Sequence, residues 1–188
     1  MKLAPFQDPL TLVEFSSQLI KTAVVKRRSA LKQFVLSTLA EQEGTLTPLS
    51  RTVVLRKVEA LFDLIIYTDT RTQKMAFLDR FPRASALFYD DRKLLQIRVE
   101  GTLSVLDSHP DIFPKLGERQ QKDYQSLLAP GTLTKAIQTP LTEENYFGIL
   151  RLKAERIDIV QLHAEGHRRI QGVLDKQGAL TSVNWVTP

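Results

Sequence analysis

Two short stretches of the sequence place basic and hydroxyl side chains next to apolar runs. Ser50–Val58, SRTVVLRKV, has Arg51 near one end and Arg56 near the other. Ile65–Lys74, IIYTDTRTQK, passes from apolar residues to threonines, an arginine and a lysine. A guanidinium offers forked donors and an ammonium a compact charge, and both bind phosphate groups. Together the two stretches suggest a site for an anion.

The second stretch also has the pattern of a helix start. Thr70 followed by Gln73 has the form of a capping box, so we expect a short helix that begins at about Arg71. Its free backbone N–H groups, the Thr72 hydroxyl and the Lys74 ammonium would then converge on an anion. A capped helix flanked by basic side chains is also common on protein surfaces. The local pattern alone leaves both interpretations open.

Length and composition limit the class of protein. The 188 residues suffice for a core, and the 43% apolar and 25% charged content is ordinary for a soluble globular protein. Cysteine is absent, which excludes disulfides and thiolate chemistry. No stretch resembles a signal peptide or a membrane span, so we expect a cytoplasmic protein without membrane contact. The net charge of +5 favours anionic partners, but the sequence has no nucleic-acid-binding motif and an aromatic share of 7%.

The apolar periodicity predicts a mainly β fold with peripheral helices. Asp8 followed by Pro9 marks a helix start, and Gly44 marks the turn of a hairpin. The expected segments are an N-terminal helix over about 9–25, a barrel core over about 33–106, a helical and loop excursion over about 109–144, and C-terminal strands over about 145–187. Six or more mostly antiparallel strands favour a closed or partly closed barrel, with Gly101 at a bulge. No linker or repeat divides the chain, so a single domain over 1–188 is expected.

Four blocks in this order resemble one known family. They are SRTVVLRKV, LIIYTDTRTQK, FPRASALFYDD and LLQIRVEG. The series is similar to the FMN-binding split barrel of the pyridoxamine 5'-phosphate oxidase family, and the resemblance is good over about residues 34–106. It implies a split β-barrel and a homodimer in which each FMN lies at the subunit interface. In a strand Arg51 and Arg56 would be about 16 Å apart, comparable to FMN from phosphate to ring.

The resemblance also assigns the residues that contact the cofactor. Arg51, Thr72 and Lys74 would hold the phosphate, and Gln96 would reach the pyrimidine edge of the flavin from the partner subunit. Several of these residues also have a purely structural interpretation, since valines pack in barrel cores and a strand glutamine can face solvent. The full set of implied cofactor-binding residues is Arg51, Val53, Val54, Arg56, Tyr67, Thr68, Thr72, Gln73, Lys74, Gln96 and Arg169.

A short C-terminal stretch, GHRRI, resembles the Arg-x-His-x-Arg element of the family. This makes His167 and Arg169 the candidate catalytic residues, with the histidine at the substrate and the arginine beside the flavin ring. His163 and His167 are four residues apart, but the segment is predicted as strand and turn, so no metal site is expected.

The positions on the substrate side depart from the family pattern. Glu165 stands where the family has an arginine that grips the pyridoxamine substrate, and Val160 stands where it has a tryptophan. Arg56 replaces a lysine. The substrate element Tyr-x-x-x-Arg-x-x-x-Ser has no counterpart, although Arg119 or Tyr124 would be substitutes.

We therefore expect an FMN-dependent oxidoreductase that transfers hydride through flavin N5. Its substrate is a small molecule, for which a phosphorylated compound is one candidate. Two alternatives remain open. One is the pyridoxine/pyridoxamine 5'-phosphate oxidase itself, against which Glu165 counts because a carboxylate repels a dianionic phosphate. The other is a non-catalytic flavin-binding dimer.

Overall fold

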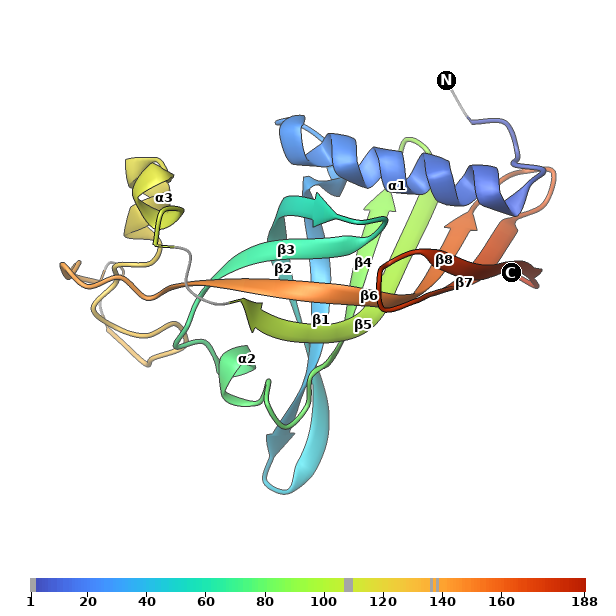
Figure 1. Ribbon diagram of the computed structural model, residues 1–188. Helices are drawn as coiled ribbons and strands as arrows, with labels where there is room; N and C mark the ends of the chain where they lie inside the picture. The colour runs from blue at the N-terminus through green and yellow to red at the C-terminus, as the bar shows by residue number, and fades with distance from the viewer. Residues whose placement is uncertain (1–2, 107–109, 136, 138) are drawn as a thin grey trace.

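The computed structural model describes residues 3–106, 110–135, 137 and 139–188. Within them the chain forms an antiparallel sheet with short helices around it (Figure 1). The strands are β1 (Gln33–Gln42), β2 (Thr45–Glu59), β3 (Asp63–Asp69), β4 (Arg83–Asp90), β5 (Leu95–Leu106), β6 (Phe147–Gln161), β7 (Arg168–Leu174) and β8 (Leu180–Val186). The helices are α1 (Pro9–Val25), α2 (Gln73–Ala76) and α3 (Glu118–Lys122), with 3-10 turns η1 (Ala30–Lys32) and η2 (Phe113–Lys115). Residue 109, the predicted start of the excursion, lies outside the described residues.

The long strand β6 closes the barrel and extends it. The sheet order is β3-β2-β1-β4-β5-β6-β7-β8, and β3 also pairs with β6, so β1 to β6 form a closed ring. The first part of β6, from Phe147 to Leu152, pairs with β3, while its last part, from Arg156 to Gln161, pairs with β7. The barrel is therefore split along β6: the first part of the strand closes the barrel against β3, and the last part continues the sheet to β7 and β8. This confirms the predicted mainly β fold with six or more antiparallel strands, whereas the single domain stays a prediction.

Two glycines explain local features of the barrel. Gly44, with φ of +76°, lies in the turn between β1 and β2, as expected. Gly101 lies at the bulge where the pairing of β5 with β6 shifts register after Glu100. A Cβ at Gly101 would lie 1.8 Å from the Lys153 carbonyl oxygen, so only glycine fits this bulge.

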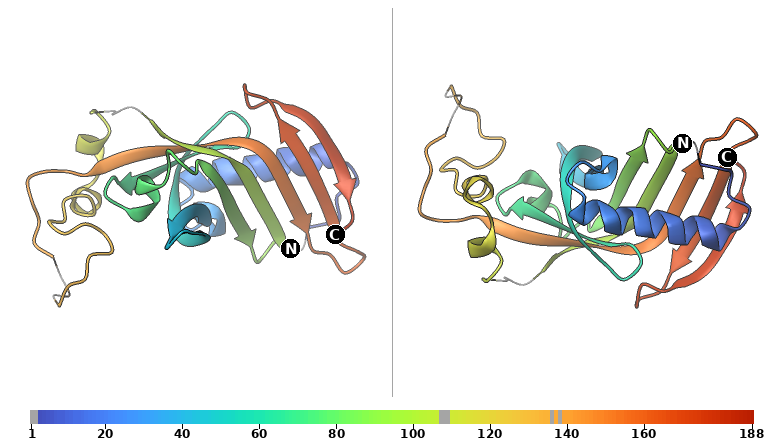
Figure 2. Two further views of the ribbon diagram at one scale, coloured as in Figure 1. Left: turned by 90° about the horizontal axis from the view of Figure 1, so that it is seen from below. Right: turned by 90° about the horizontal axis from the view of Figure 1, so that it is seen from above.

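Helix α1 packs on the barrel, as the two further views show (Figure 2). The Asp8 side chain caps its start by accepting a hydrogen bond of 2.7 Å from the Thr11 backbone N–H, and Pro9 follows at the first helical position. Its inward face buries Leu12 and Ile20 completely. The observed bounds of α1 agree with the predicted range of 9–25. Helix α3 lies far from α1, at the end of the molecule opposite the termini (Figures 1 and 2).

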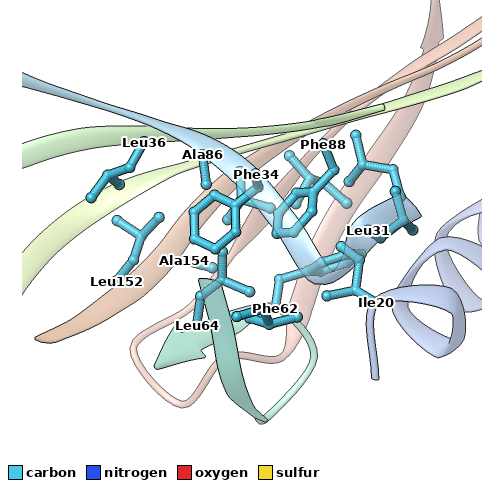
Figure 3. Packing of buried hydrophobic residues seen from close by; sticks show 14 of the residues in the cluster. Ile20, Leu31, Phe34, Leu36, Phe62, Leu64, Ala86, Phe88, Leu152 and Ala154 are labelled. Carbon is cyan, nitrogen blue, oxygen red and sulfur yellow. The ribbon is translucent and has the colours of Figure 1, made fainter. Parts of the chain in front are cut away.

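The core is a continuous apolar cluster inside the barrel and beneath α1 (Figure 3). Phe34 and Phe88 stack with ring centroids 4.5 Å apart, and Phe62 lies among aliphatic side chains. One charged side chain lies at its edge: Asp63 is fully buried and accepts hydrogen bonds of 2.8 Å from both Arg151 and Lys153. This cluster ties the start of β3 to β6. In the part of the chain that the structure describes, no helix is long and apolar enough to span a membrane.

Candidate functional site

Arg51 lies on β2, and its side chain is partly buried. It is directly opposite Leu36 of β1, and its Nη1 donates a hydrogen bond of 2.6 Å to the Thr38 hydroxyl. Burial lowers the pKa of the Arg51 guanidinium, although the group stays charged. A hydroxyl carries no charge, and no carboxylate pairs with Arg51 within the described residues.

The turn between β3 and α2 has a different structure from the capping box expected there. Thr72, not Thr70, is the residue before the helix, α2 begins at Gln73, and the Thr72 side chain makes no capping bond. The Thr72 hydroxyl donates instead to the Asp69 carbonyl oxygen at 2.9 Å. The expected capping box was therefore wrong, because the chain needs Thr70 for the strand ladder: its N–H donates to the Tyr146 carbonyl.

Asp69 and Arg71 fix this turn. Asp69 accepts hydrogen bonds from the Arg71 backbone N–H at 2.8 Å and from its guanidinium at 2.7 and 3.1 Å. The same guanidinium lies 3.4 Å from the centroid of the Tyr146 ring. Arg71 is therefore held by a carboxylate and an aromatic face, and it serves the turn rather than an anion site.

Lys74 is the second cation of the predicted phosphate site. Its Nζ donates a hydrogen bond of 3.0 Å to the Thr72 hydroxyl, which lies 3.4 Å from the Thr68 hydroxyl. Burial and the nearby positive charge of Arg51, only partly offset by Asp69, lower the pKa of Lys74 to about 8. Among the residues that the structure describes, neither Arg51 nor Lys74 forms an ion pair. The structure thus brings together Arg51, Thr68, Thr72 and Lys74, while Gln73 is exposed beside them.

A cluster of aromatic residues adjoins this site along β3 and β6. The Tyr67 ring packs edge-on against Phe147 at 4.9 Å between centroids, and the Arg56 guanidinium lies 5.1 Å from the Tyr67 ring. Tyr124, from the segment after α3, also packs edge-on against Phe147, with 5.1 Å between ring centroids. Arg56 Nε is buried without a hydrogen-bond partner in the described residues. From the sequence, Tyr124 was considered only as a substitute for part of the missing substrate element. Nothing in the residues around Phe147 indicated that it belongs to an aromatic cluster.

The other predicted residues lie at the opposite end of β6. Gln96 of β5 pairs with Val160 of β6, which in turn pairs with Arg169 of β7, so the three side chains form one row across the sheet. Asp69, by contrast, pairs with Phe147 at the start of β6. Val160 comes thirteen residues after Phe147, roughly 40 Å along an extended strand. Within one chain the two groups are therefore far apart (Figure 1).

The candidate catalytic residues border a cavity of about 290 Å³. His167 and Arg169 line it together with Trp185 and with Phe6 of the N-terminal segment. The His167 Nδ1 atom accepts a hydrogen bond of 3.1 Å from the His163 backbone N–H. His167 is therefore oriented by the turn between β6 and β7.

Arg169 is held by a carboxylate that the sequence had not suggested. Its Nε and Nη2 donate to the two carboxylate oxygens of Asp158 at 3.1 and 2.8 Å. Glu165 is exposed in the turn between β6 and β7, and its backbone N–H donates to His163 Nδ1 at 3.2 Å. Val53 and Val54 lie on β2, where Val53 packs against the core opposite Phe34, as their structural interpretation predicts.

The structure is a closed antiparallel barrel, split along β6, with a basic, hydroxyl-lined candidate anion site at the β3–α2 turn, and this defines its class as a split β-barrel. The sequence places the chain more narrowly. Residues 14–107 match the family described as pyridoxamine 5'-phosphate oxidase, FMN-binding domain, and the chain belongs to this family. The resemblance seen in the four sequence blocks is thereby confirmed. No curated protein sequence matches the chain significantly.

Solved structures with the same fold come from several bacteria. A pyridoxamine 5'-phosphate oxidase-related, FMN-binding protein of Nostoc punctiforme PCC 73102 is similar over 100% of both chains, with a TM-score of 0.72 and 21% identity. PhzG of Burkholderia lata 383, solved in complex with tetrahydrophenazine-1-carboxylic acid, has a TM-score of 0.71 and 18% identity, covering 98% of this chain and 94% of its own. A Clostridium acetobutylicum protein related to general stress protein 26 has a TM-score of 0.56 and 16% identity, covering 85% and 93%. At these identities the likeness establishes the fold.

Proposed function

We propose that the protein is an FMN-dependent oxidoreductase that binds the cofactor as a homodimer. Arg51, Thr72 and Lys74 hold the phosphate in this proposal, with Thr68 beside them. The flavin ring runs along the backbone of β2 at Val53 and Val54, toward Tyr67 and Arg56. Gln96 and Arg169 of the partner subunit complete the site, and Gln73 lies at its rim.

One observation carries the cofactor assignment: Arg51 and Lys74 are two partly buried cations, close to each other, whose charges no carboxylate neutralises in the described residues. Placing like charges together with loss of hydration costs free energy, as the lowered pKa of Lys74 shows. A dianion removes this cost, because it pairs with both cations and accepts from the Thr72 hydroxyl once that group turns toward it. The residues present therefore fit the phosphate of FMN, as expected for a family whose domain binds that cofactor.

The separation of the two groups of residues along β6 supports the proposed dimer. FMN spans about 16 Å from phosphate to ring, the length of five strand residues. It cannot contact Lys74 and the row of Gln96 and Arg169 in the same chain if these lie at opposite ends of β6. A second chain whose β5–β7 face meets the β2–β3 face of the first removes this difficulty.

Bound FMN supplies a hydride acceptor at N5. The side chains of the protein position the cofactor and its partner. Arg169 presents a fixed cation at the ring, and His167, whose Nδ1 is occupied by the His163 N–H, has Nε2 left to hold or release a proton at the cavity. This arrangement suits hydride transfer from a small molecule and requires no side-chain nucleophile.

The pyridoxamine 5'-phosphate oxidase reaction is the second candidate. The Arg56 guanidinium beside Tyr67 favours it, since its Nε is buried without a hydrogen-bond partner in the described residues and a cation at this place would attract a substrate phosphate. Glu165 at the turn disfavours it. Release of hydrogen peroxide and pyridoxal 5'-phosphate from pyridoxamine 5'-phosphate would establish this reaction. Flavin that is reduced by dithionite but by no candidate donor would favour the non-catalytic dimer instead.

The phosphate assignment is tested by comparing FMN with riboflavin, which lacks the phosphate. Titration of each flavin into the apoprotein, followed by quenching of flavin fluorescence, gives both affinities. We expect Arg51→Ala and Lys74→Ala to weaken FMN binding by about 10- to 100-fold, equivalent to about 1–3 kcal/mol per charge-assisted contact. Riboflavin binding should change less than about threefold, because the lost contacts involve only the phosphate. Lys21→Ala, an exposed cation on α1, is the matched control. Equal losses for both flavins, or none, would refute the assignment.

A further inference from the structure

Asp158 occupies an unusual position for a carboxylate on the outer face of a sheet. It lies on β6 between Arg98 of β5 and Gln171 of β7, which are its direct partners in the two ladders. Although this face points away from the barrel core, Asp158 is only 5% exposed. The three side chains that cover it are those of Arg98, Arg169 and Gln171.

The two carboxylate oxygens of Asp158 accept four hydrogen bonds, which come from Arg98, Arg169 and Gln171. Oδ1 accepts from Arg169 Nε at 3.1 Å, and Oδ2 accepts from Arg169 Nη2 at 2.8 Å. Oδ2 also accepts from Arg98 Nη2 and Gln171 Nε2, each at 2.9 Å. Burial acts to raise the pKa of Asp158, but these bonds and the two arginine charges outweigh it and lower the pKa. Asp158 is therefore ionised at neutral pH.

The forked contact fixes one edge of the Arg169 guanidinium and leaves the other edge available. Two parallel N–H to oxygen bonds define the plane and the direction of a guanidinium, which a single bond does not. Arg169 Nη1 forms no hydrogen bond or ion pair within the described part of the chain, and Arg169 lines the cavity together with His167. Arg98, in contrast, divides its contacts between Asp158 and Glu100.

We propose that Asp158 is the positioning residue for Arg169: its carboxylate clamps the guanidinium so that the free edge faces the bound flavin ring, and it sets how much positive charge the ring meets. This proposal rests on the proposed FMN function. A purely structural role is the alternative, in which Asp158 only cross-links β5, β6 and β7.

The two roles predict different effects of Asp158 on the ratio of reduced to oxidised FMN, depending on whether Arg169 is present. In Asp158→Asn the charge of Arg169 is no longer compensated, which favours the more negative, reduced flavin. We expect the ratio of reduced to oxidised FMN at a fixed poise to rise at least tenfold, which is about 30 mV for a two-electron couple. In an Arg169→Gln background the same substitution should change the ratio less than threefold. Glu155→Gln, which removes a carboxylate on the same strand that pairs with Arg83 instead, is the matched control and should leave the ratio unchanged.

A second readout requires no cofactor. In the apoprotein the Arg169 Nε–H should give a slowly exchanging signal in 15N-resolved NMR, and Asp158→Asn should abolish it. If Asp158→Asn does not fold, Asp158→Glu replaces it. This substitution keeps the charge but moves the carboxylate relative to the Arg169 guanidinium, and it is likewise measured in both the wild-type and the Arg169→Gln background. The proposal is overturned if the ratio does not shift, or if it shifts equally in both backgrounds. Failure of the wild-type protein to bind FMN would instead refute the proposed function and leave the NMR test of the clamp intact.

Discussion

Burial, together with the positive charge of Arg51, lowers the pKa of Lys74 from 10.5 to about 8. The two cations come from β2 and α2, and no carboxylate neutralises either of them in the described residues. Keeping two such cations together costs stability in the free protein, which is expected of a site that the proposed function assigns to an anion.

The apoprotein should therefore gain stability when Lys74 loses its charge. Because the pKa of Lys74 is lower in the folded than in the unfolded state, the unfolded state binds more protons between pH 8 and 10.5. The contribution of Lys74 to stability thus rises with pH across this window, and the full penalty applies below pH 8. We expect Lys74→Gln to be more stable than wild type by about 1 kcal/mol at pH 7, with the gap closing by about pH 10. Urea unfolding at both pH values measures this, and a constant gap would contradict it.

The affinity for FMN should fall as the pH rises through about 8, the pKa of Lys74 in the free protein. Binding of a dianion favours charged Lys74, so at pH 8.5 FMN binding should be accompanied by proton uptake. Calorimetry in two buffers of different ionisation enthalpy measures the protons taken up. Lys74→Gln should show much less uptake, and riboflavin none in either protein.

Mixed dimers test whether both chains build one site. In a dimer of one Arg51→Ala chain and one Gln96→Ala chain, one site carries both substitutions and the other carries neither. We expect the mixed dimer to bind one FMN with wild-type affinity, although each homodimer binds FMN at least about tenfold more weakly at both sites. Purification with two different tags isolates the mixed species. Two equally weakened sites would mean that each chain binds FMN by itself.

Gln161 anchors the N-terminal segment that borders the cavity of His167 and Arg169. Its side chain is 1% exposed, accepts from the Phe6 N–H at 3.1 Å and donates to the Ala4 carbonyl at 2.9 Å. Gln161→Leu keeps the bulk and removes both bonds, which should cost about 1–2 kcal/mol of stability. Hydrogen exchange of residues 4–8 should become faster than in wild type. Gln177→Leu, in the exposed turn before β8, should change neither quantity.

Asp63→Asn should destabilise the junction of β3 and β6. Asp63 is fully buried and pairs with Arg151 and Lys153, both of which can still reach water at 33% and 27% exposure. We therefore expect a loss of about 2–3 kcal/mol, at the lower end for a broken buried pair. Chemical unfolding measures the loss. Glu59→Gln, which removes a contact to Arg151 at 3.6 Å and an exposed pair with Lys57 at 2.7 Å, should cost less than about 0.5 kcal/mol.

The grouping of basic and hydroxyl side chains at the candidate site could be predicted because its parts are local. Arg51 lies on a strand that the sequence pattern predicts, and Thr72 and Lys74 are two residues apart at one predicted helix start. Residue types and spacing therefore already suggested an anion site. The same locality misled in one respect. The sequence fits a capping box of Thr70 and Gln73. In the structure the Thr70 backbone N–H donates to the Tyr146 carbonyl instead, and Thr72 is the residue before the helix.

The aromatic cluster and the Arg169 clamp could not be predicted, since both depend on pairing between distant strands. Phe147 meets Tyr67 only because β6 closes the barrel against β3. Asp158 meets Arg169 only because the second part of β6 leaves β3 and pairs with β7. A strand pattern shows which face a side chain takes, but not which strand lies beside it.

The sequence by itself determined the β architecture, the family and the basic turn, because each is encoded in the periodicity and types of neighbouring residues. The tertiary structure decided which charges are compensated. It paired Arg71 with Asp69 and Arg169 with Asp158, and within the described residues it left Arg51 and Lys74 together without an ion pair. Compensation depends on distances of a few ångströms between segments far apart in the chain, and only folding sets those distances.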